Sequence, residues 1–431
     1  MTAPASGTEL ADTRKPLKPS RIIAAASVGN ALEWYDIAVY SFFAVYIAKV
    51  FFPNHDASVS LVLALGTFGV SFLIRPLGAF ILGSYADRAG RKPALTLSLS
   101  LMVIGTMMIV LMPSYATIGV TAPIGILVAR LIQGFAAGGE FGSATALMVE
   151  HLPNRPGFAA SWQFASQAAS SLIAALIGTL LTSVLSIQQL ESWGFRLPFI
   201  FGLLVGPVGI YIRRHVPETG AIRAVIEGGA QNFPARTVLK RQKKLVLLTI
   251  GVLAATTCLN YMISYIPTYA IHTLKLPASS GFAATMMAGI VLLVVTPFAG
   301  HLSDKFGQLR IMIPAAVLIL LLIYPMFGFM VAVPALGTML LVLFFMGLFK
   351  ACYYGPMSAA MASIFPAETR ATGMAVGYNI GVTIFGGFTP LVATLLINST
   401  GNALSPSFWV IFAALVSTVS LVILWRRMGL R

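Results

Sequence analysis

The stretch GNALEWYDIAVY, from Gly29 to Tyr40, places Glu33 and Asp36 inside a hydrophobic run long enough to span a membrane. A charged side chain at the centre of a bilayer costs about 2.5–3.5 kcal/mol even on the most lenient insertion scale. Positions three apart on a helix are neighbours on its surface, so both carboxylates can face one interior cavity. This indicates a proton or cation site. The alternative is an internal ion pair that holds two helices together.

The composition requires a membrane protein. The chain has 431 residues, of which 58% are hydrophobic and only 10% charged, and its mean hydropathy is +0.87. A soluble domain carries roughly 25% charged residues, so this chain cannot cover its surface with polar groups. The net charge of +15 would suggest nucleic acid in a soluble protein. Here the bases lie between apolar segments, so we expect a lipid bilayer as partner and no nucleic acid.

Spanning helices need about 20 apolar residues, and glycine, proline and charges mark their ends. On this basis we predict an all-α membrane protein with twelve transmembrane helices in two six-helix bundles. The first bundle, 22–212, contains spans at 22–50, 59–82, 93–112, 120–147, 158–186 and 194–212. The second, 245–425, contains spans at 245–271, 279–300, 311–332, 335–363, 373–398 and 406–425.

The basic residues predict the orientation. They concentrate in the N-terminal tail (1–21), in the linker between the bundles (213–244) and in the C-terminal tail (426–431), whereas the opposite loops hold almost none. Cytoplasmic connections carry the excess of Lys and Arg. We therefore expect both tails and the linker to be cytoplasmic.

One loop pattern occurs twice, half a chain apart. GSYADRAGRK starts at Gly83 and GHLSDKFGQLR starts at Gly300, which gives Asp87 and Asp304 equivalent places. Two repeated halves imply two bundles that rock about a site near the midplane. We expect the loop charges to form a gate that is made in one state and broken in the other: Asp87, Arg88, Arg91 and Asp304. The alternative is an ordinary positive-inside turn.

Arg75 lies in the apolar sequence FLIRPLGAF. A guanidinium binds a carboxylate through two parallel hydrogen bonds and cannot discharge its proton. Arg75 is therefore a candidate ligand for an anionic substrate. The alternative is a permanent partnership with Glu33 or Asp36.

The sequence RLIQGFAAGGEFG places Arg130, Gln133 and Glu140 on one helical face. Arg130 could tune a nearby acid or hold substrate, and Glu140 lies nearer the cytoplasmic end, where it suits a gate or a packing contact. A structural Arg–Glu network is the alternative. Small residues recur every four positions along the same helix and predict close packing: Gly134, Gly138 and Gly142.

Lys350 lies in the middle of an apolar span, where a lysine is a functional hypothesis by default. Arg196 could face the cavity or extend to the outer interface. The remaining candidates for the substrate site are uncharged polar side chains: Tyr40, Gln163, Gln167 and Asn379. For each of these, a packing contact or a hydrogen bond between helices is the alternative.

The charges within the predicted spans nearly balance, with three acids against three bases before Arg196 is counted. If an acid is protonated, an excess of positive charge remains and favours an anion. This is the electrostatic logic of proton–anion symport. We find no metalloprotease, phosphate-loop, nucleophile-elbow or Cys/His cluster motif, so we predict no enzyme, cofactor or metal site.

GSYADRAGRK and RLIQGFAAG resemble the loop and fourth-helix signatures of the major facilitator superfamily, whose fourth-helix arginine is associated with proton coupling. More narrowly, GNALEWYD, FLIRPLGAFILGSYADRAGRKPAL, QGFAAGGEFG, ESWGFRLPF and IFGGFTP together resemble the metabolite:proton symporters. The resemblance covers nearly the whole chain. It implies a monomer in the bacterial inner membrane that takes up a metabolite with protons.

Within that family, YIAKVFFP and the closing stretch from Phe385 to Trp409 look most similar to the citrate and tricarballylate branch. The resemblance implies that Arg75 and Arg196 hold substrate carboxylates and that Asp36 is a coupling acid. Trp34–Tyr35 looks more like the shikimate and ketoglutarate members, and Gln308 replaces a usual base of the second loop.

We therefore expect proton-driven import of a small organic anion, a di- or tricarboxylate such as citrate. The rivals are import of a shikimate-like monoacid or a zwitterion such as proline or betaine, export of drugs or metabolites, and a sensor that transports nothing. The chain ends soon after the last span, without the long helical tail of the osmosensing members, which argues against proline or betaine.

Overall fold

The computed structural model describes residues 19–89, 91–139, 145, 148–149, 152, 154–203, 241–366 and 369–428. These residues form helices joined by turns and short loops, and no strand occurs among them. The predicted all-α class is confirmed. Most of the predicted linker, 213–244, lies outside the described residues.

The helices of the first half follow the order of the chain. They are α1 (Pro19–Phe42), α2 (Ala44–Phe51), α3 (Ala57–Leu73), α4 (Arg75–Ala89), α5 (Arg91–Leu111), α6 (Tyr115–Ile118), α7 (Thr121–Ala136), η1 (Ala137–Gly139), α9 (Pro156–Val184), α10 (Ile187–Ser192) and η2 (Gly194–Arg196).

The helices of the second half are longer and less interrupted. They are α14 (Lys243–His272), α15 (Ala278–Phe306), α16 (Gln308–Ala332), α17 (Leu336–Ile364), α18 (Arg370–Val382), η4 (Thr383–Gly387), α19 (Thr389–Thr400) and α20 (Pro406–Met428).

Within the described residues, eight helices are long and apolar enough to cross a membrane, and a bent pair makes a ninth. All six spans predicted for the second half are among them, as are the spans predicted at 59–82 and 158–186. The other three predicted spans occur as shorter apolar helices within the described residues: Thr96–Leu111, Thr121–Ala136 and Gly194–Leu203.

The bent pair is the span predicted at 22–50. The chain turns by 68° between Phe42 and Ala44, so α1 and α2 are two helices where one was expected. Phe43 lies between the two helices with φ −96° and ψ 14°, and neither glycine nor proline marks the position. The aromatic packing of Phe43 against Tyr46 and against Phe282 of α15 accompanies the bend.

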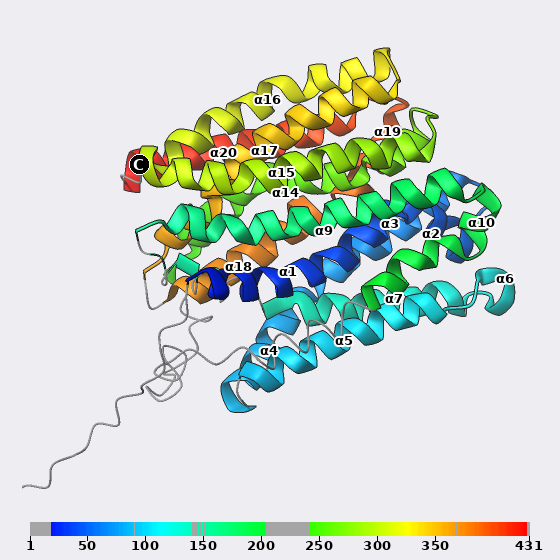
Figure 1. Cartoon of the computed structure of the whole chain (residues 1–431), viewed down its shortest axis with the longest axis horizontal. Helices are drawn as coiled ribbons and strands as arrows, with labels where there is room; N and C mark the ends of the chain where they lie inside the picture. The colour runs from blue at the N-terminus through cyan, green and yellow to red at the C-terminus, as the bar shows by residue number, and fades with distance from the viewer. Residues whose placement is uncertain are drawn as a thin grey trace, which may run out of the picture.

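The two halves lie side by side, with their helices running in roughly the same direction (Figure 1). Helices α14 to α17 and α20 group on one side, and α3, α4, α5 and α7 on the other. The halves meet where α9 packs on α15 and α17, where α1 packs on α14, and where α3 packs on η4 and α19. The start of α1 and the end of α20 lie at the same end of the molecule (Figure 1).

Small residues bring the halves into close contact. A Cβ atom on Gly157 of α9 would lie 2.6 Å from the carbonyl oxygen of Gly300 on α15, and one on Gly300 would lie 2.6 Å from the carbonyl oxygen of Gly157. Further along the same interface, the ring of Phe164 stacks on Tyr354 of α17 at 4.0 Å. Residues that line a site between the halves therefore come from both.

Candidate functional site

Five charged side chains are buried within the described part of the chain. They are Glu33, Asp36, Arg75, Arg130 and Lys350. Each was expected from sequence to lie inside the protein, and each is at most 7% exposed. Three are positive and two negative, so the described interior carries an excess of positive charge when all five are ionised.

Asp36 is joined to Arg130 through a chain of hydrogen bonds. Arg130 donates from Nη1 to Oε1 of Gln133 at 2.7 Å, and Gln133 donates from Nε2 to the hydroxyl of Thr106 at 2.9 Å. Thr106 in turn donates to Oδ2 of Asp36 at 2.5 Å. Every donor points toward the carboxylate, an arrangement in which each bond polarises the next.

The other oxygen of Asp36, Oδ1, is buried without a hydrogen-bond partner. It lies beside Gly202, where a Cβ atom would come within 2.7 Å of it. A small cavity of about 20 Å³ adjoins this carboxylate, lined also by Met102 and Leu203. Such a volume is about enough for one water molecule. A proton can therefore be held at Oδ1 without disturbing the bond from Thr106.

Arg75 and Glu33 form a loose pair across α4 and α1. Arg75 Nη2 lies 3.8 Å from Glu33 Oε1, beyond hydrogen-bond distance. The guanidinium lies over the ring of Phe72 at 4.3 Å and near Trp34 at 5.9 Å, and its Nε has no partner. The sequence left open a permanent pair between Arg75 and Glu33. The structure contains this pair, but without a hydrogen bond between the two groups, so a substrate carboxylate could still bind Arg75.

Arg130 lies close to two aromatic rings, 4.5 Å from the centre of Tyr40 and 5.1 Å from that of Phe68. It also donates to the hydroxyl of Ser71. Tyr40 itself stacks on Phe68 and donates to the carbonyl of Ala64. Tyr40 therefore supports Arg130, and its hydroxyl is engaged within the first half.

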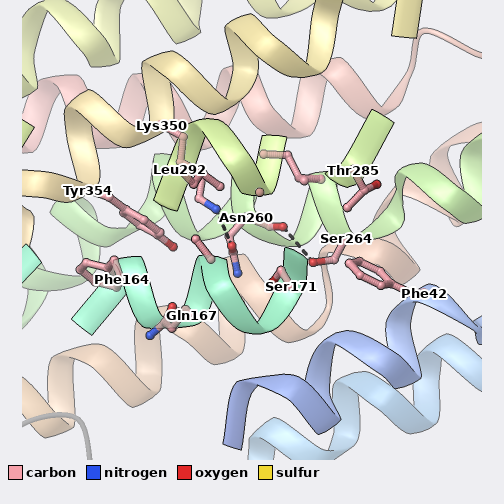
Figure 2. Close-up of a pocket in the computed structure, with 13 residues that line it drawn as sticks. Phe42, Phe164, Gln167, Ser171, Asn260, Ser264, Thr285, Leu292, Lys350 and Tyr354 are labelled. Atoms are coloured by element: carbon pink, nitrogen blue, oxygen red, sulfur yellow. Dashed lines mark hydrogen bonds between the residues drawn. The ribbon is translucent and has the colours of Figure 1, made fainter. Parts of the chain in front are cut away.

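A cavity between the two halves contains Lys350 (Figure 2). Lys350 Nζ donates to Oδ1 of Asn260 at 2.5 Å and lies 4.7 Å from the ring centre of Tyr354. No carboxylate of the described residues lies within 4 Å of this ammonium group. Gln167 of α9 lines the same cavity, and neither atom of its buried amide makes a hydrogen bond of normal geometry.

This cavity is closed. Its free volume is about 10 Å³, comparable to one water-sized sphere. A metabolite with several carboxylates needs far more space, so α9 must separate from α14, α15 or α17 before such a molecule can enter.

Three predicted substrate residues are engaged elsewhere in this conformation. Gln163 accepts from Thr145 within the first half. Asn379 of α18 donates to the carbonyl of Gly138 in the other half. Arg196 donates to the carbonyl of Met112, just past the end of α5, and does not line the cavity. Their roles in binding stay predictions.

Among the predicted gate residues, the structure places Asp304. Its two carboxylate oxygens accept the backbone N–H groups of Gly157 and Phe158, at 2.7 and 2.9 Å. Asp304 on α15 thus caps the first turn of α9 across the boundary between the halves. Glu140 lies outside the described residues, as do the side chains of Asp87, Arg88 and Arg91.

Several residues of this site were not predicted from the sequence. Thr106 and Asn260 are polar residues inside apolar spans. The presence of a polar side chain in such a span was the only signal in the sequence, and it could have identified Asn260. Tyr261 of α14 packs among Trp34, Phe68 and Phe72 of the first half, and an aromatic residue in an apolar helix gives no such signal.

Two bundles of apolar helices with charged side chains buried inside them are the architecture of many secondary transporters. The chain matches the profile described as the Major Facilitator Superfamily over residues 26–296 and again over 286–429, and it belongs to that superfamily. The double match agrees with the repeated halves.

Curated relatives match along most of the chain. A citrate-proton symporter of Klebsiella pneumoniae is 38% identical over 401 residues, which cover 93% of this chain and 90% of the relative. A citrate-proton symporter of Salmonella typhi is 35% identical and covers 93% of each chain. A proline/betaine transporter of Escherichia coli (strain K12) is 33% identical, covering 94% of this chain and 83% of the relative.

Solved structures share the fold at lower identity. The xylose transporter of E. coli in a partially occluded inward-open conformation aligns with a TM-score of 0.73 at 17% identity, over 95% of this chain and 97% of the other. A D-xylose-proton symporter aligns with a TM-score of 0.74, also at 17% identity, over 94% and 97%. The predicted fold is confirmed.

Proposed function

We propose that this protein is a proton-coupled symporter that imports a small organic anion, a di- or tricarboxylate such as citrate. The observation that carries the proposal is the unequal number of buried charges. Arg75, Arg130 and Lys350 face only Glu33 and Asp36 in the described interior. A buried charge is costly without a counter-charge, and a substrate carboxylate would supply the missing one.

Asp36 is the proposed coupling acid. When a proton neutralises it, the buried groups go from a net charge of about +1 to about +2, by the count of three bases and two acids above. Loading a proton therefore strengthens the attraction for an anion, and releasing the proton weakens it. The hydrogen-bond chain through Thr106 and Gln133 would transmit this change to Arg130.

Arg75 and Lys350 are the proposed substrate ligands, one from each half. Arg75 has an incompletely paired guanidinium, and Lys350 contacts an amide oxygen and an aromatic ring, with no described carboxylate within 4 Å. A molecule with two or more carboxylates could bind both cations at once. A substrate that binds both cations would hold the two halves together. A monoacid has one carboxylate and could not do so, which favours a polycarboxylate as substrate.

Import of a zwitterion such as proline or betaine is the second candidate, because proline/betaine transporters are among the relatives. A quaternary ammonium group is recognised by open aromatic faces. Here the aromatic faces of the site are covered by the protein's own cations: Arg75 lies over Phe72, Arg130 over Tyr40 and Lys350 near Tyr354. This favours an anion over betaine.

The test is uptake into proteoliposomes under an imposed inward proton gradient, with labelled citrate, ketoglutarate, shikimate, proline and betaine offered separately. We expect gradient-dependent accumulation of a di- or tricarboxylate and none of betaine. Accumulation of proline or betaine, with no carboxylate transported, would overturn the proposal. We further propose a monomer in the bacterial cytoplasmic membrane with both termini in the cytoplasm, which tag accessibility in intact cells can check.

A further inference from the structure

Tyr261 of α14 belongs to the second half, but its ring lies in an aromatic cluster of the first. Its ring centre is 5.4 Å from Phe72, 6.0 Å from Phe68 and 6.2 Å from Trp34. The opposing backbone of η4 leaves room for the ring because Gly386 has no side chain. A Cβ atom there would lie 2.7 Å from Cε2 of Tyr261. The ring position is therefore fixed from two sides.

The same aromatic residues hold the two buried arginines. Arg75 lies over Phe72 and near Trp34, and Arg130 lies beside Phe68. The phenol group of Tyr261 is close enough to interact electrostatically with both guanidinium groups and with the carboxylate of Glu33. Tyr261 is thus a residue of the second half that packs on the aromatic rings beside Arg75 and Arg130.

The hydroxyl of Tyr261 is buried and has no hydrogen-bond partner, although the residue is only 1% exposed. The other tyrosines of α14 differ. Tyr265 accepts a hydrogen bond from Thr394 at 2.9 Å, and Tyr269 donates to the carbonyl of Ala403 at 2.8 Å. Buried polar groups are nearly always paired, so an exception beside two cations requires an explanation.

We propose that Tyr261 is a substrate-binding residue whose hydroxyl donates a hydrogen bond to a carboxylate held by Arg75. This rests on the proposed function and adds a ligand from the second half to the anion site. A carboxylate there would pair the guanidinium of Arg75 on one side and the phenol of Tyr261 on the other. It would therefore link α4 to α14, and its binding would draw the two halves together.

The test is Tyr261→Phe, which removes one oxygen and keeps the ring. We expect the apparent affinity for citrate to fall roughly 10-fold or more, the usual consequence of losing a hydrogen bond to a charged group. Thermal stability without citrate should stay equal or rise, because the lost hydroxyl has no protein partner. The stabilisation produced by saturating citrate should shrink.

Tyr265→Phe is the matched control, one turn further along the same helix. Its hydroxyl accepts a hydrogen bond from Thr394, whereas that of Tyr261 has no partner. We expect it to lower thermal stability without citrate and to leave the affinity for citrate unchanged.

Unchanged affinity for citrate in Tyr261→Phe would overturn the inference alone. A loss of stability in that variant would also overturn it, because the hydroxyl would then have a structural partner. If the unmodified protein neither binds nor transports citrate or another di- or tricarboxylate, the proposed function fails and the inference falls with it.

Discussion

At the scale of single residues, the two acids of the first helix are held in different ways. Glu33 lies beside a permanent cation, Arg75, at 3.8 Å. Asp36 accepts one hydrogen bond, from Thr106, and its second oxygen adjoins a water-sized cavity. Glu33 thus has a cation as its direct neighbour, whereas Asp36 keeps one carboxylate oxygen without a hydrogen-bond partner beside space for a water molecule. This difference favours Asp36 as the coupling acid.

Asp36→Asn tests that assignment. Asn keeps an oxygen that accepts from Thr106, but it cannot bind and release a proton. We expect accumulation of citrate against its gradient to be lost, while exchange of labelled for unlabelled citrate continues in proteoliposomes. The control is Glu191→Gln, which removes an exposed carboxylate paired with Lys49 and should leave accumulation unchanged. Uphill transport at the normal rate in Asp36→Asn would rule out its coupling role.

The sequence was sufficient to predict which charges are buried, because charged residues inside apolar spans are rare and conspicuous. It was not sufficient to predict their partners. Arg130 reaches Asp36 through Gln133 and Thr106, and this depends on how α5 and α7 pack together. Tyr261 was missed for a related reason, since its surroundings are created by residues of the opposite half.

At the scale of helices, the spacing of glycines predicted the packing correctly. The expected small-residue face of the fourth span includes Gly134 and Gly138, and side chains at either would collide with the α3–α4 segment, at Ser71 and Arg75. The bend between α1 and α2 was not predicted, because no residue type marks it; it occurs at Phe43, whose ring packs against Phe282 of α15. Close helix packing could therefore be predicted from the spacing of glycines, whereas the bend between α1 and α2 could not be predicted from the sequence.

Gly138→Ala tests this contact between η1 and α4. A Cβ atom at 138 would meet the carbonyl of Arg75 and lie 2.5 Å from the backbone nitrogen of Ala79. Overpacking of this kind costs about 1–3 kcal/mol, so we expect a lower melting temperature in detergent and a weaker affinity for citrate as Arg75 is displaced. Gly66→Ala is the control, because nothing lies within 4 Å of its added methyl group. Equal melting temperatures would contradict the packing argument.

At the scale of the whole molecule, the contact between Asp304 and the start of α9 joins the two halves. The first N–H groups of a helix lack partners within the helix, and they carry its positive dipole end. Asp304 supplies acceptors for two of them from the opposite half. Separation of the halves at this end must break both bonds, so the contact stabilises the closed arrangement specifically.

Asp304→Ala should therefore shift the protein toward opening at this end. A cap is worth about 0.5–2 kcal/mol, which corresponds to a change of roughly 2- to 30-fold in the ratio of closed to open molecules. Spin labels at Asn154 and Phe306, which are exposed on opposite halves near the contact, would report the opening as a longer distance by double electron–electron resonance.

Asp56→Ala is the control, because Asp56 caps α3 at Ser58 within its own half. It should lower stability without lengthening the distance. If Asp304→Ala gave the distance distribution of the unmodified protein, Asp304 would be a local cap that does not govern opening.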